Sequence, residues 1–180
     1  MKEQPTLATE RLILRPYVLD DAKELQRLIG DHAIADTKIL IPHPYIDGMA
    51  EEFISKRQRE FEGGKSVQFA ITHREQGYLI GGTGMQLEEI HQKASIGYWI
   101  GKPYWGKGYC TEAASAVVKY GFEALGLNRI YAIHMTRNPR SGRVMQKIGM
   151  KHEGHMRKNW KKWGEFEDVE LYAILRSEMR

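Results

Sequence analysis

The stretch from Gly97 to Ala114 constrains the fold of this chain more than any other part of the sequence. It reads GYWIGKPYWGKGYCTEAA and opens with four residues suited to a strand. A short segment with three glycines and one proline follows, and from Thr111 onwards apolar residues recur at steps of three and four. That spacing marks one face of a helix. The stretch therefore predicts a strand, a glycine-rich loop and a helix.

The loop of this unit is suited to binding a phosphate. A helix N-terminus offers unpaired N–H groups and a partial positive charge. Gly106 and Gly108 remove side chains where an anion must approach the backbone, and two lysines lie nearby. A tight turn into a helix is the plainer alternative, because Gly-x-Gly before a helix is a weak signal. The P-loop does not fit, since Tyr109 follows Gly108, and neither does the dinucleotide fingerprint, since Thr111 replaces its third glycine.

Length and composition indicate one globular domain over residues 1–180. Hydrophobic residues make up 42% of the chain and charged residues 28%, which excludes a disordered chain. The single cysteine, Cys110, allows no internal disulfide and fits a reducing cytoplasm. The N-terminus lacks an apolar targeting segment, and no apolar stretch approaches membrane length. The net charge of +4 permits an anionic ligand without requiring a nucleic acid.

The hydrophobic pattern predicts an α+β domain with a mixed, mostly antiparallel sheet of about seven strands and helices on both faces. The strands are expected near 11–17, 66–72, 78–87, 93–100, 128–134, 151–157 and 167–175. The helices are expected near 22–29, 48–62, 111–125 and 139–148. The passage from strand to helix to strand over 93–134 implies a parallel pair with a right-handed crossover. Residues 32–46 are ambiguous, and residues 158–166 are expected to join the last two strands.

The run PYWGKGYCTEA resembles the acetyl-CoA loop of the GNAT N-acetyltransferases, especially the branch with the Rim-type ribosomal-protein N-acetyltransferases. The resemblance is strongest over 95–154, extends to both ends of the chain and is weak over 32–92. Pro103 departs from the Arg or Gln that the superfamily often has there, but resembles this branch. The resemblance implies a GNAT fold, in which two parallel strands splay apart around the pantetheine arm. Here these would be the strands ending at Ile100 and His134.

The resemblance also implies acetyl-CoA as co-substrate, with no metal. Backbone N–H groups of the loop would hold the pyrophosphate, and backbone near Ile100 would bind the pantetheine and polarise the thioester carbonyl. Asn138 would contact the cofactor arm, although an asparagine before Pro139 also suits a helix cap. The cofactor-binding residues expected in this way are Trp99, Ile100, Gly101, Trp105, Gly106, Lys107, Gly108, Tyr109, Cys110, Thr111, Asn138 and Ser141.

Acetyl transfer to an amine also needs an acid for the leaving thiolate and a base for the amine. The resemblance places Ser141 near the cofactor sulfur, where it would protonate the thiolate directly or through water; a polar residue of the first helical turn is the alternative. Tyr172 is a second candidate donor by analogy with the family, although a core tyrosine on the last strand is the favoured interpretation. Cys110 is expected to be inert, because nothing in the sequence pairs it with a base.

The general base is the least determined part of the site. The resemblance would put a carboxylate just before Gly97 or within 157–163, but the sequence has Ser95-Ile96 and RKNWKKW there. Two candidates remain: Glu112, which equally suits a helix start, and His134, with an ordinary pKa of about 6.5. A water-mediated base is the third possibility.

The function implied is a cytoplasmic N-acetyltransferase that acts on a primary amine, with a protein N-terminal α-amine as the best acceptor. Acetylation of a small-molecule amine is the alternative within enzymes. A non-catalytic module that binds CoA or RNA is the alternative from another class, because the basic and aromatic run at 157–163 could stack on single-stranded RNA. A solvated loop beside the substrate cleft is the favoured interpretation of that run. The chain is expected to be a monomer or homodimer, with no membrane partner and no nucleic-acid partner.

Overall fold

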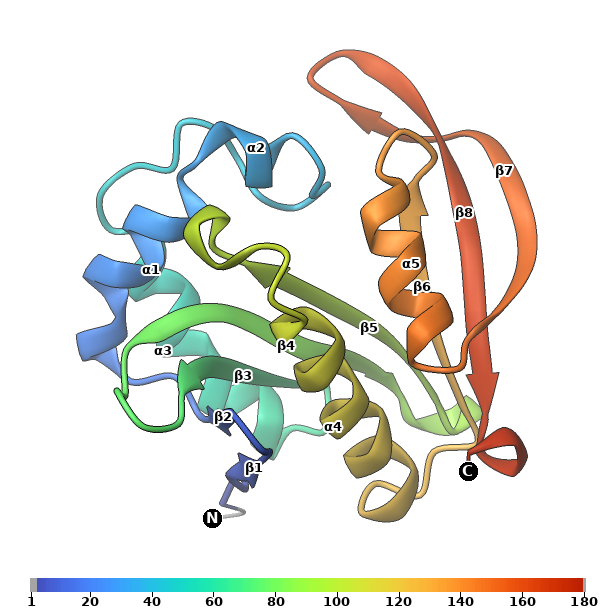
Figure 1. The fold of residues 1–180 in the computed structure, drawn as a ribbon, viewed down its shortest axis with the longest axis horizontal. Coiled ribbons are helices and arrows are strands. Elements are labelled where there is room, and N and C mark those ends of the chain that lie inside the picture. The colour runs from blue at the N-terminus through green and yellow to red at the C-terminus, as the bar shows by residue number, and fades with distance from the viewer. Residues whose placement is uncertain (1–2, 180) are drawn as a thin grey trace.

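The computed structural model describes residues 3–179 (Figure 1). The strands are β1 (Leu7–Ala8), β2 (Leu12–Arg15), β3 (Ser66–His73), β4 (Leu79–Glu88), β5 (Lys93–Ile100), β6 (Arg129–Met135), β7 (Lys151–Lys162) and β8 (Glu165–Leu175). The α-helices are α1 (Ala22–Ile29), α2 (His32–Ala35), α3 (Met49–Glu62), α4 (Tyr109–Glu123) and α5 (Pro139–Lys147). The strand, loop and helix predicted around the glycines are therefore β5, residues 101–108 and α4.

The strands form one mixed sheet in the order β1-β2-β3-β4-β5-β6-β8-β7. Every neighbouring pair is antiparallel except β5 and β6, so the prediction of a mostly antiparallel sheet with one parallel pair is confirmed. The described residues hold eight strands rather than about seven. The additional strand, β1, pairs through Leu7 and Ala8 alone, and two residues are too few to produce a periodic pattern.

The parallel pair is splayed, as expected. β5 and β6 pair only through Lys93 with Arg129, Ala94 with Ile130 and Ser95 with Tyr131. Beyond these residues the two strands diverge, and Figure 1 shows them opening toward the ends from which α4 and α5 start. Over their final residues, β5 and β6 therefore do not pair with each other.

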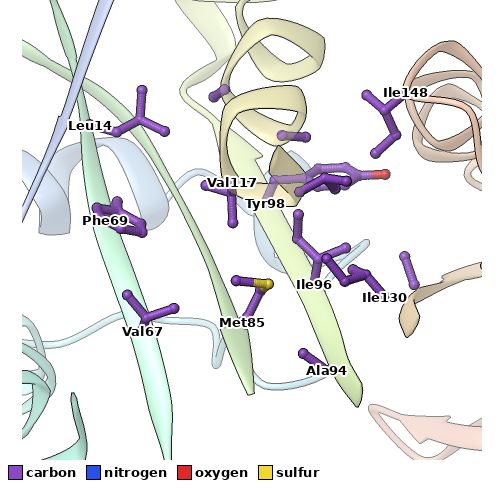
Figure 2. Close-up of a cluster of buried hydrophobic side chains, with 14 of the residues drawn as sticks. Leu14, Val67, Phe69, Met85, Ala94, Ile96, Tyr98, Val117, Ile130 and Ile148 are labelled. Carbon is purple, nitrogen blue, oxygen red and sulfur yellow. The ribbon is translucent and has the colours of Figure 1, made fainter. Parts of the chain in front are cut away.

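The core lies on both faces of the sheet. Successive side chains of β5 point alternately into one or the other of its two clusters. Ile96, Tyr98 and Ile100 belong to a buried cluster with Val117 of α4, whereas Trp99 packs against a second cluster that α1 and α3 build. This period of two is what a strand covered on both faces requires. Figure 2 shows Tyr98 within the first cluster, with its hydroxyl oxygen directed to the side on which Ile148 lies.

The hairpin of β7 and β8 extends further than the sequence predicted. Residues 158–162 and 165–166, expected in the connection, belong to β7 and β8, and residues 160–162 pair with residues 165–167. The tip is held by contacts with a distant segment: the Lys162 ammonium donates to the carbonyls of Lys38 and Ile41, each at 2.7 Å. The Trp163 ring lies 5.0 Å from that of His32, between centroids. A lysine-rich run acquires a fixed strand structure here because the hairpin tip binds the residues that follow α2.

Candidate functional site

A cavity of about 790 Å³ lies at the open end of the splayed strands. The end of β5, the glycine-rich loop, the first turns of α4 and α5, and the segment from α2 to Lys38 form its wall. Many of the predicted cofactor residues line it, namely Trp99, Ile100, Trp105, Gly106, Gly108, Tyr109, Cys110, Thr111, Asn138 and Ser141. The fold therefore brings the loop and the start of α5 together around one space. Gly101, Lys107, Glu112, His134 and Tyr172 are not part of the wall.

The loop has the backbone conformation that a phosphate cradle needs. Gly106 and Gly108 have φ of +79° and +81°, in the left-handed region that favours glycine. A Cβ on Gly106 would meet no atom within 4 Å, so conformation rather than space requires glycine there. Gly108 is the N-cap of α4 and provides no side-chain cap. The first N–H groups of α4 are left for an anion, with the helix dipole adding to the attraction.

Glu112 anchors this loop to the N-terminal strands. Its carboxylate accepts hydrogen bonds from Thr9 Oγ1 at 2.6 Å, from the Arg11 backbone N–H at 2.8 Å and from Arg11 Nε at 2.8 Å. Arg11 Nη1 also donates to the carbonyl of Lys107 at 2.9 Å. Burial acts to raise the pKa of Glu112, but these hydrogen bonds together lower it. Glu112 is thus an ionised tether of the loop, and Arg11 is its partner that the sequence did not reveal.

Ser141 lies in the cavity wall beside Tyr98. The Tyr98 hydroxyl is 3.0 Å from the carbonyl of Ser141, to which it donates, and 3.1 Å from Ser141 Oγ. Both residues are buried, and burial raises the pKa of Tyr98, so its phenol stays neutral. Asn138 holds the N-cap position of α5 but forms no side-chain cap within the described residues, which leaves its amide available to a ligand. Tyr98 was missed because an inward-facing strand tyrosine gives no sequence signal.

His134 and Tyr172 lie together beneath α5. A Cβ built on Gly142 of α5 would come within 2.7 Å of His134 Nε2, so the helix covers the ring directly. His134 Nδ1 bonds the carbonyl of Met135 at 2.8 Å, and the Tyr172 ring lies 5.7 Å from the His134 ring, between centroids. This position gives neither residue a place on the cavity wall, and we therefore do not propose them as base or acid.

The cavity wall is strongly cationic. Its basic residues are Lys38, Arg137, Arg140, Arg143 and Lys147, and no Asp or Glu of residues 3–179 lines it. The Arg140 guanidinium lies 5.5 Å from the ring centroid of Trp105, beside the loop. Burial raises the pKa of the Cys110 thiol to about 12, so it stays protonated and is not a nucleophile.

The site has room for an anionic, phosphate-bearing cofactor. Within residues 3–179, no group of three or more His, Cys, Asp and Glu side chains could hold a metal ion. No helix in that part of the chain is long and apolar enough to cross a membrane. The free N–H groups of α4, the unpaired strand edges and the cations of α5 are the features that fit phosphates followed by an amide-containing arm.

Comparisons with known proteins agree with this geometry. A family model described as "Acetyltransferase (GNAT) domain" matches residues 11–151. The "Uncharacterized N-acetyltransferase p20" of Bacillus licheniformis is 33% identical over 175 residues, which cover 96% of this chain and 97% of that protein. The "Putative ribosomal N-acetyltransferase YdaF" of Bacillus subtilis is 31% identical, with 94% and 93% covered. A solved GNAT-family acetyltransferase from Bacillus anthracis superposes with a TM-score of 0.86 at 29% identity, covering 97% of this chain and all of the other.

Proposed function

The chain belongs to the GNAT family of acetyl-CoA-dependent N-acetyltransferases, and we propose that its acceptor is the α-amino group at a protein N-terminus. One observation carries the proposal: no Asp or Glu of residues 3–179 lines the cavity. Without a carboxylate base, the enzyme is suited to an amine that loses its proton readily. An α-amine has a pKa near 8 and a lysine side chain near 10.4, a gap worth roughly 3 kcal/mol.

In this proposal, each group of residues on the cavity wall has its own role in acetyl transfer. The N–H groups from Gly106 to Thr111 bind the pyrophosphate, and the inner edge of β5 near Ile100, which does not pair with β6, binds the pantetheine amides and polarises the thioester carbonyl. The Ile100 carbonyl itself accepts a hydrogen bond from Trp105 Nε1 at 2.6 Å. The Asn138 amide contacts the same arm. Acetyl-CoA supplies the activated acyl group, which the neutral amine attacks.

Ser141 handles the proton of the leaving group. Its hydroxyl gives a proton to the thiolate as the carbon–sulfur bond breaks, and it recovers one from the newly acylated nitrogen directly or through water, so that no net charge remains on the serine. Tyr98, 3.1 Å from Ser141 Oγ, holds the hydroxyl in position. Water serves as the base for the ammonium form of the acceptor.

One further observation supports the proposal. The relative YdaF carries a name that refers to a ribosomal N-acetyltransferase, and it is similar over nearly the whole chain. A small-molecule amine is the alternative acceptor class. We also place the activity in the cytoplasm, which suits the single free cysteine.

The experiment compares two matched peptide sets with the purified protein and acetyl-CoA. One set has a free N-terminus and no lysine; the other is blocked at the N-terminus and contains lysine. Mass spectrometry should find acetyl groups on the first set, with a rate that rises between about pH 7 and 9 as the α-amine loses its proton. Acetylation mainly on lysine side chains would overturn the proposal and imply a base that we have not identified.

A further inference from the structure

Lys38 lies in the cavity without an acidic partner. It follows α2 in the chain, and its ammonium lies 5.1 Å from the ring centroid of Tyr98. No carboxylate of residues 3–179 pairs with it, and burial lowers its pKa. The Lys38 side chain is half-buried, and an ammonium that is partly removed from water and has gained no anion is costly to the folded protein. An anionic group brought by a ligand would offset that cost.

The other cations of the wall are already engaged or lie where the cofactor phosphates are expected. Arg137 is paired with Asp36 at 2.6 Å and with Glu167 at 2.8 Å. Arg140, Arg143 and Lys147 come from α5, which starts beside the loop. α2 and the residues after it lie on the other side of the open end from α5 (Figure 1). Lys38 thus lies beside Tyr98, which contacts Ser141, where the acyl group is transferred in our proposal.

The backbone that carries Lys38 is held in place. The buried Lys162 ammonium donates to the carbonyl of Lys38 and to that of Ile41, each at 2.7 Å, and so joins this segment to the end of β7. The Trp163 ring next to it packs on His32. A charged side chain on a fixed backbone loses little further freedom when it binds an ion, which favours a specific contact.

We propose that Lys38 binds a carboxylate of the acceptor, so that the preferred substrate is an amine with an acidic group close to it. This inference rests on the proposed transfer to an α-amine and names the class of acceptor within it. The same cationic wall repels polycationic amines. Two sources supply the carboxylate: an acidic side chain next to the N-terminal residue of a polypeptide, or the α-carboxylate of a free amino acid.

The test uses peptides that begin Ser-Asp, Ser-Asn or Ser-Arg and are otherwise identical and free of lysine. A charge-assisted contact should favour the Ser-Asp peptide over Ser-Asn by about tenfold or more in kcat/KM, with Ser-Arg slowest. Comparing free serine with serinamide tests whether the α-carboxylate of a free amino acid can supply the carboxylate. Spermidine tests whether polycationic amines are excluded. N-terminal acetylation is measured by mass spectrometry and thiol release.

Variants of Lys38 link the preference to this residue. Lys38→Met should abolish the discrimination between Ser-Asp and Ser-Asn through the acceptor KM, with the KM of acetyl-CoA unchanged. Lys38→Glu should reverse the order and favour Ser-Arg. Lys119→Met is the matched control, because Lys119 is exposed on α4 and does not line the cavity. It should keep the wild-type preference.

Three results would overturn the inference: equal rates on Ser-Asp and Ser-Asn in the wild type, a rise in the acetyl-CoA KM for Lys38→Met with the acceptor preference intact, or efficient acetylation of spermidine. Failure of the proposed function is distinguishable, because then none of the peptides is acetylated on its α-amine whatever its second residue.

Discussion

Replacing Gly108 by valine should weaken binding of acetyl-CoA more than tenfold while the fold persists. Gly108 has φ of +81° and ψ of −1°, a conformation that costs an ordinary L-residue about 1–2 kcal/mol and a β-branched residue more. Space is not limiting, because a Cβ would lie 3.4 Å from its nearest neighbour, Arg11 Nη2. The backbone therefore relaxes its strain by rotating, and the N–H groups at the start of α4 turn with it.

The magnitude follows from the hydrogen bonds that such a rotation removes. One N–H bond to a charged phosphate is worth about 1.5–3 kcal/mol, and 1.4 kcal/mol is already a factor of ten in affinity. Stability should fall by about the strain energy alone, which for a chain of this length is a decrease in Tm of roughly 2–8 °C. Affinity is measured by calorimetry with acetyl-CoA and stability by thermal unfolding.

Gly126→Val separates strain from binding. Gly126 also has a left-handed φ, of +68°, its Cβ would meet nothing within 4 Å, and it does not line the cavity. This control should lose a similar amount of stability and keep its affinity for acetyl-CoA. A folded Gly108→Val protein that binds within twofold of the wild type, or equal loss of affinity in both variants, would refute the phosphate cradle.

Two further predictions concern the leaving group and the stability of the sheet. Ser141→Ala should lower kcat by roughly 10²- to 10⁴-fold with the KM of acetyl-CoA nearly unchanged; a kcat within twofold of wild type would make Ser141 a helix residue only. Hydrogen bonds from His155 and His152 lower the pKa of Glu170 to about 2, so its contribution to stability is present above about pH 4.5 and is lost as the pH falls toward 2. Glu170 raises the pKa of His155, so the stability that their ion pair contributes declines again as the pH rises and His155 loses its proton. Glu170→Gln should therefore lower Tm most near pH 5–6, and a Tm difference that does not vary with pH would contradict this account.

Local sequence chemistry was sufficient for the elements that bind the cofactor in our proposal. The glycines at 106 and 108 predicted a loop, and both have the positive φ that only glycine adopts easily. The Asn138-Pro139 pair predicted the start of α5, which begins at Pro139. Strand-forming residues between a turn and the glycine loop predicted a strand over 93–100, which is β5. These signals are readable because turn, cap and strand preferences depend on neighbouring residues alone.

The sequence could not show which distant side chains meet. Glu112 was a candidate base, but contacts with Thr9 and Arg11, about a hundred residues earlier, make it a tether of the loop. His134 stands at the end of β6, as predicted, yet Gly142 of α5 covers its ring. Position along a strand does not determine which element packs on it, because that depends on how the helices cross the sheet.

The sequence by itself determined the mostly antiparallel α+β fold, the parallel pair with its glycine loop, and the family. Tertiary structure alone decided the charge and shape of the cavity: Lys38 over Tyr98, Tyr98 against Ser141, and the tip of β7 bound to the carbonyls after α2. The physical reason is that backbone conformation follows short-range sterics and hydrogen bonding, whereas the partner of a buried charge or hydroxyl depends on contacts between residues 43 or more positions apart in the chain.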